Sequence, residues 1–158
     1  MEIAQNILLT IATAATPLLI AAIGELIVER SGVLNLGVEG MMVIGAVCGF
    51  AAAILTGNAW IGVIAGIAGG ALLSLLFGFL TLSLATNQVA TGLSLTLLGI
   101  GLSGLIGEGF VGQAGVRLPT LDIPVLTDIP LVGRLIFGQD PIFYMSIALT
   151  AGVMGLPF

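Results

Sequence analysis

The feature that most constrains this chain is its shortage of charged side chains. Three arginines and eight acidic residues make up 7% of its 158 residues, whereas an average soluble domain has about 25%. Hydrophobic residues account for 58%, and 24 residues are glycine. A soluble fold needs a polar surface, which so few charges cannot supply for a domain of this size. The sequence therefore predicts an integral membrane protein.

The missing residue types also exclude several kinds of chemistry. Histidine is absent and the one cysteine, Cys48, lies in an apolar run, which argues against a zinc site and against a Cys–His nucleophile. No segment has the Gly-rich, lysine-containing spacing of a phosphate-binding loop. The formal net charge of −5 argues against nucleic acid as a partner, because phosphate binding needs clustered Lys and Arg. We therefore expect no catalytic residue, no metal site and no bound cofactor in this chain.

Long apolar runs divide the sequence into predicted membrane spans, because a helix needs about 20 mostly apolar residues to cross the bilayer. Short polar or glycine-containing breaks separate the runs, and a proline-rich extramembrane loop follows the fourth. The prediction is an all-α, polytopic transmembrane helix bundle that forms a single domain over residues 1–158. Its four to five spanning helices are expected at about residues 5–28, 36–55, 59–85, 89–107 and 142–158, with the long loop at 108–141.

The arginines give the predicted orientation of the spans. Arg30 lies in a short link between the first two spans, whereas Arg117 and Arg134 lie among acidic residues in the long loop. The positive-inside rule therefore places the 29–35 link in the cytoplasm, together with the break at 86–88. We expect the long loop to lie on the opposite side of the membrane, with the N-terminus.

Small residues recur at every fourth position in two of the predicted spans. Positions i and i+4 share one face of a helix, and helices in lipid approach each other closely through such residues. We therefore expect these faces to pack against other helices of the bundle. They comprise Gly45 and Gly49 in the second span and Gly62, Gly66, Gly70, Ser74 and Gly78 in the third.

Several polar residues lie near the ends of the predicted spans. Glu25 and Glu39 flank the 29–35 link, and an ionisable residue inside a span points to function. Their positions alone favour solvation at the membrane surface or pairing with Arg30. Asn35, Asn87 and Gln88 either cap helices or line a polar path, and their spacing does not decide between these roles.

Two segments resemble a known family of membrane proteins. The first is Glu-Arg-Ser-Gly-Val at 29–33 followed by Asn-Leu-Gly-Val-Glu-Gly-Met at 35–41, and the second is Asn-Gln-Val at 87–89 followed by Gly92. Both are similar to segments in permease subunits of bacterial ATP-binding-cassette (ABC) importers. The branch is the branched-chain amino acid/ribose-type superfamily that serves nucleosides and simple sugars. The matches together span most of residues 16–107.

The resemblance implies a permease subunit that forms the translocation path for a nucleoside or simple sugar in the bacterial cytoplasmic (inner) membrane. A second permease subunit would complete the path, a cytoplasmic ABC ATPase would bind ATP and drive transport, and an extracytoplasmic solute-binding protein would deliver the solute. The first motif is most similar to purine-nucleoside permeases, with sugar and riboflavin permeases close to it. Such permeases continue well beyond Phe158, so the chain is expected to be incomplete at its C-terminus. The candidate residues along the path are Glu29, Arg30, Asn35, Glu39, Asn87 and Gln88.

Two other classes of protein remain as alternatives. A small oligomeric channel or secondary transporter accounts for the glycines and the short chain, but it predicts charged residues facing a pore. The central parts of the spans have none. A purely structural membrane protein leaves the 29–41 motif without a purpose. A neighbouring gene for an ATPase with a phosphate-binding loop would favour the importer.

Overall fold

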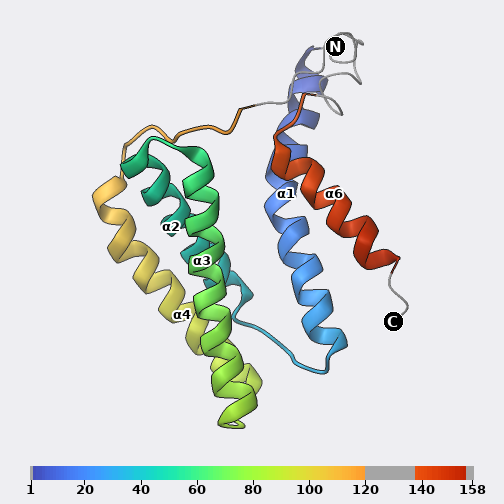
Figure 1. Cartoon of the computed structure of the whole chain (residues 1–158), viewed down its shortest axis with the longest axis vertical. Coiled ribbons are helices and arrows are strands. Elements are labelled where there is room, and N and C mark those ends of the chain that lie inside the picture. The colour runs from blue at the N-terminus through green and yellow to red at the C-terminus, as the bar shows by residue number, and fades with distance from the viewer. Residues whose placement is uncertain (1, 120–137, 156–158) are drawn as a thin grey trace. The chain divides into compact units, whose positions relative to one another are not determined.

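The computed structural model describes residues 2–119 and 138–155, which contain helices and no strands (Figure 1). Four stretches of helix in this part of the chain are long and apolar enough to cross a membrane. The predicted all-α, polytopic membrane fold is thus confirmed. The helices are α1 (Glu2–Arg30), α2 (Val38–Thr56), α3 (Ala59–Gly78) with the π-helical turn η1 (Phe79–Ser83), α4 (Gln88–Gly107) with the 3₁₀ turn η2 (Glu108–Phe110), and α6 (Pro141–Met154).

The described residues form two compact units, one of residues 2–26, 118–119 and 138–155 and the other of residues 27–117. The four long helices follow the predicted spans to within a few residues. Helix α6 has only 14 residues, which is short for a span of about 20. Most of the predicted 108–141 loop lies outside the described residues, and the single-domain organisation stays a prediction.

Helix α1 remains regular around Pro17, and a glycine shortly after its last residue turns the chain. The hydroxyls of Thr10, Thr13 and Thr16 each donate to the carbonyl four residues earlier, at 2.8–3.0 Å. These bonds leave no threonine proton unsatisfied in an apolar setting. After Arg30 the chain turns at Gly32, whose φ is +87°. The Gly32 and Val33 amides donate back to carbonyls of the last turn, as in a glycine-terminated helix.

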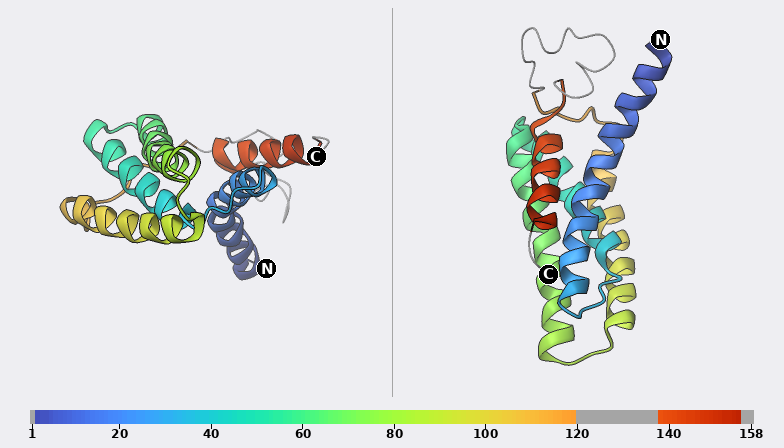
Figure 2. Two further views of the ribbon diagram at one scale, coloured as in Figure 1. Left: turned by 90° about the horizontal axis from the view of Figure 1, so that it is seen from below. Right: turned by 90° about the vertical axis from the view of Figure 1, so that its right-hand side faces the viewer.

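Helices α2 and α3 form a hairpin with a two-residue connection. Gly57 has a φ of +66°, which ends α2 in the left-handed conformation that glycine adopts without strain. The Asn58 side chain then accepts a hydrogen bond from the Trp60 amide at 2.9 Å and caps α3. So short a connection makes the two helices antiparallel neighbours. Helix α2 also packs against α4, and Figure 2 (left) shows α2 flanked by α3 and α4.

Glycines bring the backbones of α2 and α3 together. A β-carbon on Gly66 would lie 3.0 Å from the Gly45 carbonyl oxygen. One on Gly62 would lie 2.8 Å from the Gly49 oxygen and 2.7 Å from the Ala53 β-carbon. Contacts this short leave no room for a side chain, so backbone atoms themselves form the interface.

Only the first part of the small-residue face predicted on α3 packs closely against α2. Gly70 has room for a β-carbon, Ser74 is exposed, and nothing lies within 4 Å of a β-carbon on Gly78. Each four-residue step advances the helix by about 40° beyond a full turn, so four steps rotate the stripe by about 160°. The buried face instead continues through Gly69, Leu73 and Phe77.

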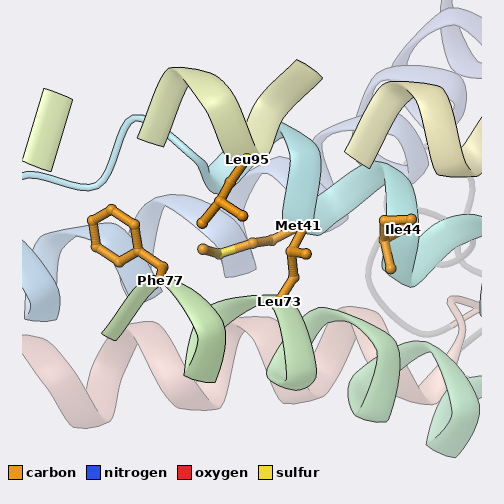
Figure 3. Packing of buried hydrophobic residues seen from close by; sticks show 5 residues of the cluster. All are labelled: Met41, Ile44, Leu73, Phe77 and Leu95. Atoms are coloured by element: carbon orange, nitrogen blue, oxygen red, sulfur yellow. The ribbon is translucent and has the colours of Figure 1, made fainter. Parts of the chain in front are cut away.

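The apolar core of residues 27–117 lies where the first turns of α2 meet α3 and α4. Figure 3 shows Met41 of α2 meeting Leu73 and Phe77 of α3 and Leu95 of α4, with Ile44 one turn further along α2. All five side chains are at most 9% exposed. Outside this cluster, most large apolar side chains of these helices are exposed, as expected for surfaces that face lipid or further helices.

Helix α3 ends in the π-helical turn η1, where the Leu84 amide donates to the Phe79 carbonyl five residues earlier. Thr86 then closes the turn, because both its amide and its hydroxyl donate to the Leu80 carbonyl, at 3.2 and 2.8 Å. Ala85 has a φ of +50°, an uncommon value for a residue with a β-carbon. These bonds satisfy two carbonyls of η1 and close the turn that leads into α4.

The helix directions give a testable topology for residues 27–117. Ser31 precedes α2 and Val111 follows α4, so three spans separate them. We expect single cysteines at Ser31 and Val111, in a Cys48→Ala background, to react with an impermeant thiol reagent from opposite sides of the membrane. Ser31→Cys should be labelled only after permeabilisation, according to the positive-inside rule. Labelling of both from outside intact cells would contradict the three-span arrangement.

The glycine contact gives a second prediction. Gly62→Ala should lower the stability of the purified protein in detergent by about 1–3 kcal/mol, because its β-carbon overlaps Ala53 and Gly49. Gly78→Ala is the matched control on the same helix, with open space around its β-carbon. Thermal unfolding measures both. Equal stability of the two variants would show that the α2–α3 backbones do not approach as closely as described.

Candidate functional site

The strongest candidate site is the irregular segment 33–37 that leads into α2, which we call the link segment. It coincides with the first family-like motif. The start of α2 is set back along α3 and α4 from the turn that connects these two helices (Figure 1). Gly37 lies beside Gly92, one turn into α4, and the Met41 carbonyl lies beside Gly70, more than three turns before the end of η1. The link segment and the start of α2 therefore lie alongside the bodies of α4 and α3 and not at the ends of these helices.

Side chains of α4 satisfy the backbone of the link segment. The Leu34 amide donates to the Gln88 Oε1 at 2.8 Å, and the Thr96 Oγ1 donates to the Leu36 carbonyl at 2.9 Å. Non-helical backbone at membrane depth is tolerated only where protein or water satisfies its polar groups. Gln88 and Thr96 provide partners that the link segment cannot obtain from a helix of its own.

Glycines allow the link segment and α2 to approach α4 at van der Waals distance. A β-carbon on Gly92 would lie 2.9 Å from the backbone nitrogens of Leu36 and Gly37. In the first turn of α2, a β-carbon on Gly40 would lie 2.6 Å from the Leu95 carbonyl oxygen, and one on Gly99 would lie 2.6 Å from Gly40. These positions fix the depth of α2 against α4, because no larger residue fits.

Asn35 joins the link segment to the core. It is 6% exposed, its Oδ1 accepts a hydrogen bond from the Gly37 amide at 2.9 Å, and its Nδ2 donates to the Met41 sulfur at 3.6 Å. The first bond forms a local turn that leads into α2, whose N-cap is Gly37. The second ties that turn to a methionine of the apolar cluster.

The structure brings only some of the six candidate path residues together. Asn35 and Gln88 both bond to the backbone of the link segment. Asn87 instead caps α4, because its side chain accepts a hydrogen bond from the Ala90 amide at 3.0 Å. Glu29 and Arg30 are exposed in the last turn of α1, and Glu39 is exposed in the first turn of α2. A carboxylate near a helix N-terminus and a cation near a C-terminus are both favourable, which accounts for Glu39 and Arg30 without substrate.

Sequence reasoning missed Thr96, which lies on α4 two turns after Gln88. The signal was present in the spacing, because Gln88, Gly92 and Thr96 recur every four residues and so share one face. A helix face that combines an amide, a glycine and a hydroxyl is suited to hold a neighbouring extended backbone. The partner of that face was not deducible, because it lies more than 50 residues earlier in the chain.

The chemistry of this site is that of neutral hydrogen bonding. Its polar groups are amides, a hydroxyl and backbone atoms, and the nearest carboxylate on α2, Glu39, is exposed. Among the described residues, no group of three His, Cys, Asp or Glu side chains is placed to hold a metal ion. The arrangement suits structural support or contact with an uncharged polar solute rather than proton or group transfer.

Comparison with known proteins places the chain among membrane permeases. Residues 7–156 match the family model described as branched-chain amino acid transport system / permease component, and the chain belongs to this family. With its four helices of spanning length, it is a multi-pass protein of the cytoplasmic membrane. No solved structure matches it.

Three relatives of the chain are named as ABC transporter permease proteins. The chain is 44% identical over 151 residues to a putative glucose ABC transporter permease protein of Haloferax volcanii. It is 31% identical over 144 residues to the guanosine ABC transporter permease protein of Bacillus subtilis, and 28% over 135 residues to the nucleoside ABC transporter permease protein of Lactococcus lactis. These matches cover 93%, 84% and 79% of this chain but only 46%, 44% and 43% of the relatives. The chain thus spans less than half the length of the relatives it matches.

The Gln88 contact gives a third prediction. Gln88→Ala leaves the Leu34 amide without its partner, which should destabilise the protein by about 1–3 kcal/mol. Gln88→Glu retains an oxygen acceptor at the same place and adds a charge that favours a helix N-terminus, so its stability should stay near wild type. Thermal unfolding in detergent distinguishes the two. A loss of stability in Gln88→Glu equal to that in Gln88→Ala would mean that the acceptor is not what matters.

Proposed function

We propose that this chain is part of the permease subunit of an ABC importer and contributes to the translocation path for a nucleoside or simple sugar. The observation that carries the proposal is the family match across residues 7–156. Relatives named for glucose, guanosine and nucleosides set the range of substrates. These solutes are uncharged and rich in hydrogen-bonding groups, in keeping with spans that contain almost no charge.

The partners in this proposal follow from the same class. ATP binds to a separate cytoplasmic ATPase and not to this chain, which needs no cofactor and catalyses no reaction of its own. A second permease subunit completes the path, and an extracytoplasmic solute-binding protein delivers the solute. The recessed start of α2 supports a role in such a path, because helices that begin within the membrane commonly border transport sites.

In the proposed mechanism the link segment helps form the cytoplasmic end of the path. It combines an irregular backbone with a buried amide at Asn35, and the first turn of α2 adds an exposed carboxylate at Glu39. Glycines at 37 and 40 let this arrangement lie close against α4. In this proposal, its neutral polar groups orient an uncharged solute by hydrogen bonds.

Uptake in cells tests the function. The complete subunit, produced with its ATPase and solute-binding protein in a strain without nucleoside and glucose uptake, should restore accumulation of radiolabelled guanosine or glucose. Replacing the phosphate-loop lysine of the ATPase should abolish it. Accumulation that persists without a working ATPase would favour the alternative of a channel or secondary transporter. No accumulation of either solute would refute the proposed substrates.

Substitutions in the link segment test its role. Asn35→Ala and Glu39→Gln should reduce uptake several-fold at equal membrane abundance, because each removes a polar group from the proposed path. Glu108→Gln makes the same chemical change as Glu39→Gln at an exposed residue after α4, and should leave uptake unchanged. If Asn35→Ala lowers only the abundance and Glu39→Gln changes nothing, the segment is a structural turn and not part of the path.

A further inference from the structure

A second candidate site lies in the other compact unit, whose described residues are 2–26, 118–119 and 138–155. A cavity of about 250 Å³ separates the middle of α1 from the start of α6. Thr13, Thr16 and Pro17 line it from α1, and Gln139, Asp140 and Phe143 line it from the segment that opens α6. None of these residues belongs to the link segment or to either family-like motif.

The α1 side of the cavity offers acceptors for hydrogen bonds. Pro17 has no amide hydrogen, so the Thr13 carbonyl lacks the donor that normally closes a helical turn. The hydroxyls of Thr13 and Thr16 already donate their protons to carbonyls of α1, at 3.0 and 2.9 Å. They therefore meet a ligand through their oxygen lone pairs.

The α6 side adds a carboxylate. Asp140 occupies the N-cap of α6 and also lines the cavity, and its side chain makes no capping hydrogen bond to that helix. Residues 13–20 are near the middle of α1, which runs from 2 to 30. A carboxylate beside the centre of a span-length helix is costly unless water or a polar solute solvates it. A polar solute in the cavity would provide that solvation.

The cavity also has an apolar wall, formed by Pro17 and the half-buried ring of Phe143. Its volume lies below the roughly 300–1,000 Å³ of sites for drug-sized ligands, so it suits a group the size of one sugar ring. The matching ligand presents several hydrogen-bond donors on one side and an apolar face on the other. The ring of a ribose or hexose does both, since its hydroxyls donate and its C–H groups pack on aromatic rings.

We propose that this cavity binds the sugar ring of the transported solute. Neighbouring hydroxyls of the ring donate to the Asp140 carboxylate and to the hydroxyl and carbonyl oxygens of Thr13, and the C–H face of the ring lies on Phe143. This inference rests on the proposed function and adds to it the chemical group that is recognised and the residues that recognise it. It fits a family whose members are named for glucose, guanosine and nucleosides, because all of these solutes contain a hydroxylated ring.

The test compares guanosine with 2′,3′-dideoxyguanosine, which lacks the paired hydroxyls, in the complete transporter with its partners. Wild type should prefer guanosine. Asp140→Asn should raise the KM for guanosine about tenfold, as expected for a lost hydrogen bond to a charged group. The KM for the dideoxy analogue should stay unchanged. For a transporter that takes up glucose instead, 2-deoxyglucose is the matched analogue.

Threonines on α1 provide a matched control. Thr13→Val removes a lone-pair acceptor from the cavity and should raise the KM for guanosine by a few-fold. Thr10→Val removes the same kind of hydroxyl, bonded in the same way to the carbonyl four residues earlier, but outside the cavity lining, and should leave KM unchanged. Since KM does not depend on the number of transporters in the membrane, a folding defect does not mimic the result.

The outcomes separate this inference from the function on which it rests. If wild type transports guanosine but Asp140→Asn discriminates against the dideoxy analogue as strongly as wild type, the cavity is not the sugar site. The same conclusion follows if both analogues lose affinity equally. If wild type with its partners transports neither guanosine nor glucose, the proposed function fails first and the sugar-site assignment fails with it.

Discussion

The structure of residues 27–117 depends on the hydrogen bonds that satisfy the backbone of the five-residue link segment before α2. In hydrocarbon an unsatisfied amide or carbonyl costs several kcal/mol. Here Gln88 accepts from the Leu34 amide, Thr96 donates to the Leu36 carbonyl, and Asn35 accepts from the Gly37 amide. Because two of these three partners belong to α4, the link segment and the start of α2 are held to α4 by directional bonds.

The glycines act together with those bonds. Hydrogen bonds of 2.8–2.9 Å between α4 side chains and the link backbone require the two backbones to come close, and Gly92, Gly40 and Gly99 remove the atoms that would keep them apart. On the opposite side of α2, Gly45 and Gly49 allow the same closeness to α3. Helix α2 is thus held from both sides mainly through backbone contacts, with one small apolar cluster at its first turns.

Much of this architecture was accessible from the sequence because it is local. Apolar length predicted the helices, and the Asn58 and Asn87 caps and the turn at Gly57 follow from residue chemistry. The failures were of two kinds. A four-residue repeat was extended to Ser74 and Gly78, although rotation of the helix carries those positions away from α2. The contact between the link segment and Thr96 was missed, because the spacing of Gln88, Gly92 and Thr96 shows that they share a face but not which distant segment this face contacts.

The separation of those partners along the chain has a consequence for biosynthesis. The Leu34 amide and its Gln88 partner are 54 residues apart, an interval of about 3–10 s at ordinary rates of translation. Helices α2 and α3 are joined by a short turn and can pair as soon as both are synthesised. The link segment can form its hydrogen bonds to Gln88 and Thr96 only after α4 has been synthesised. During that interval its polar backbone must be hydrated or shielded by the insertion machinery. Co-translational assembly of this region is therefore completed by the arrival of α4.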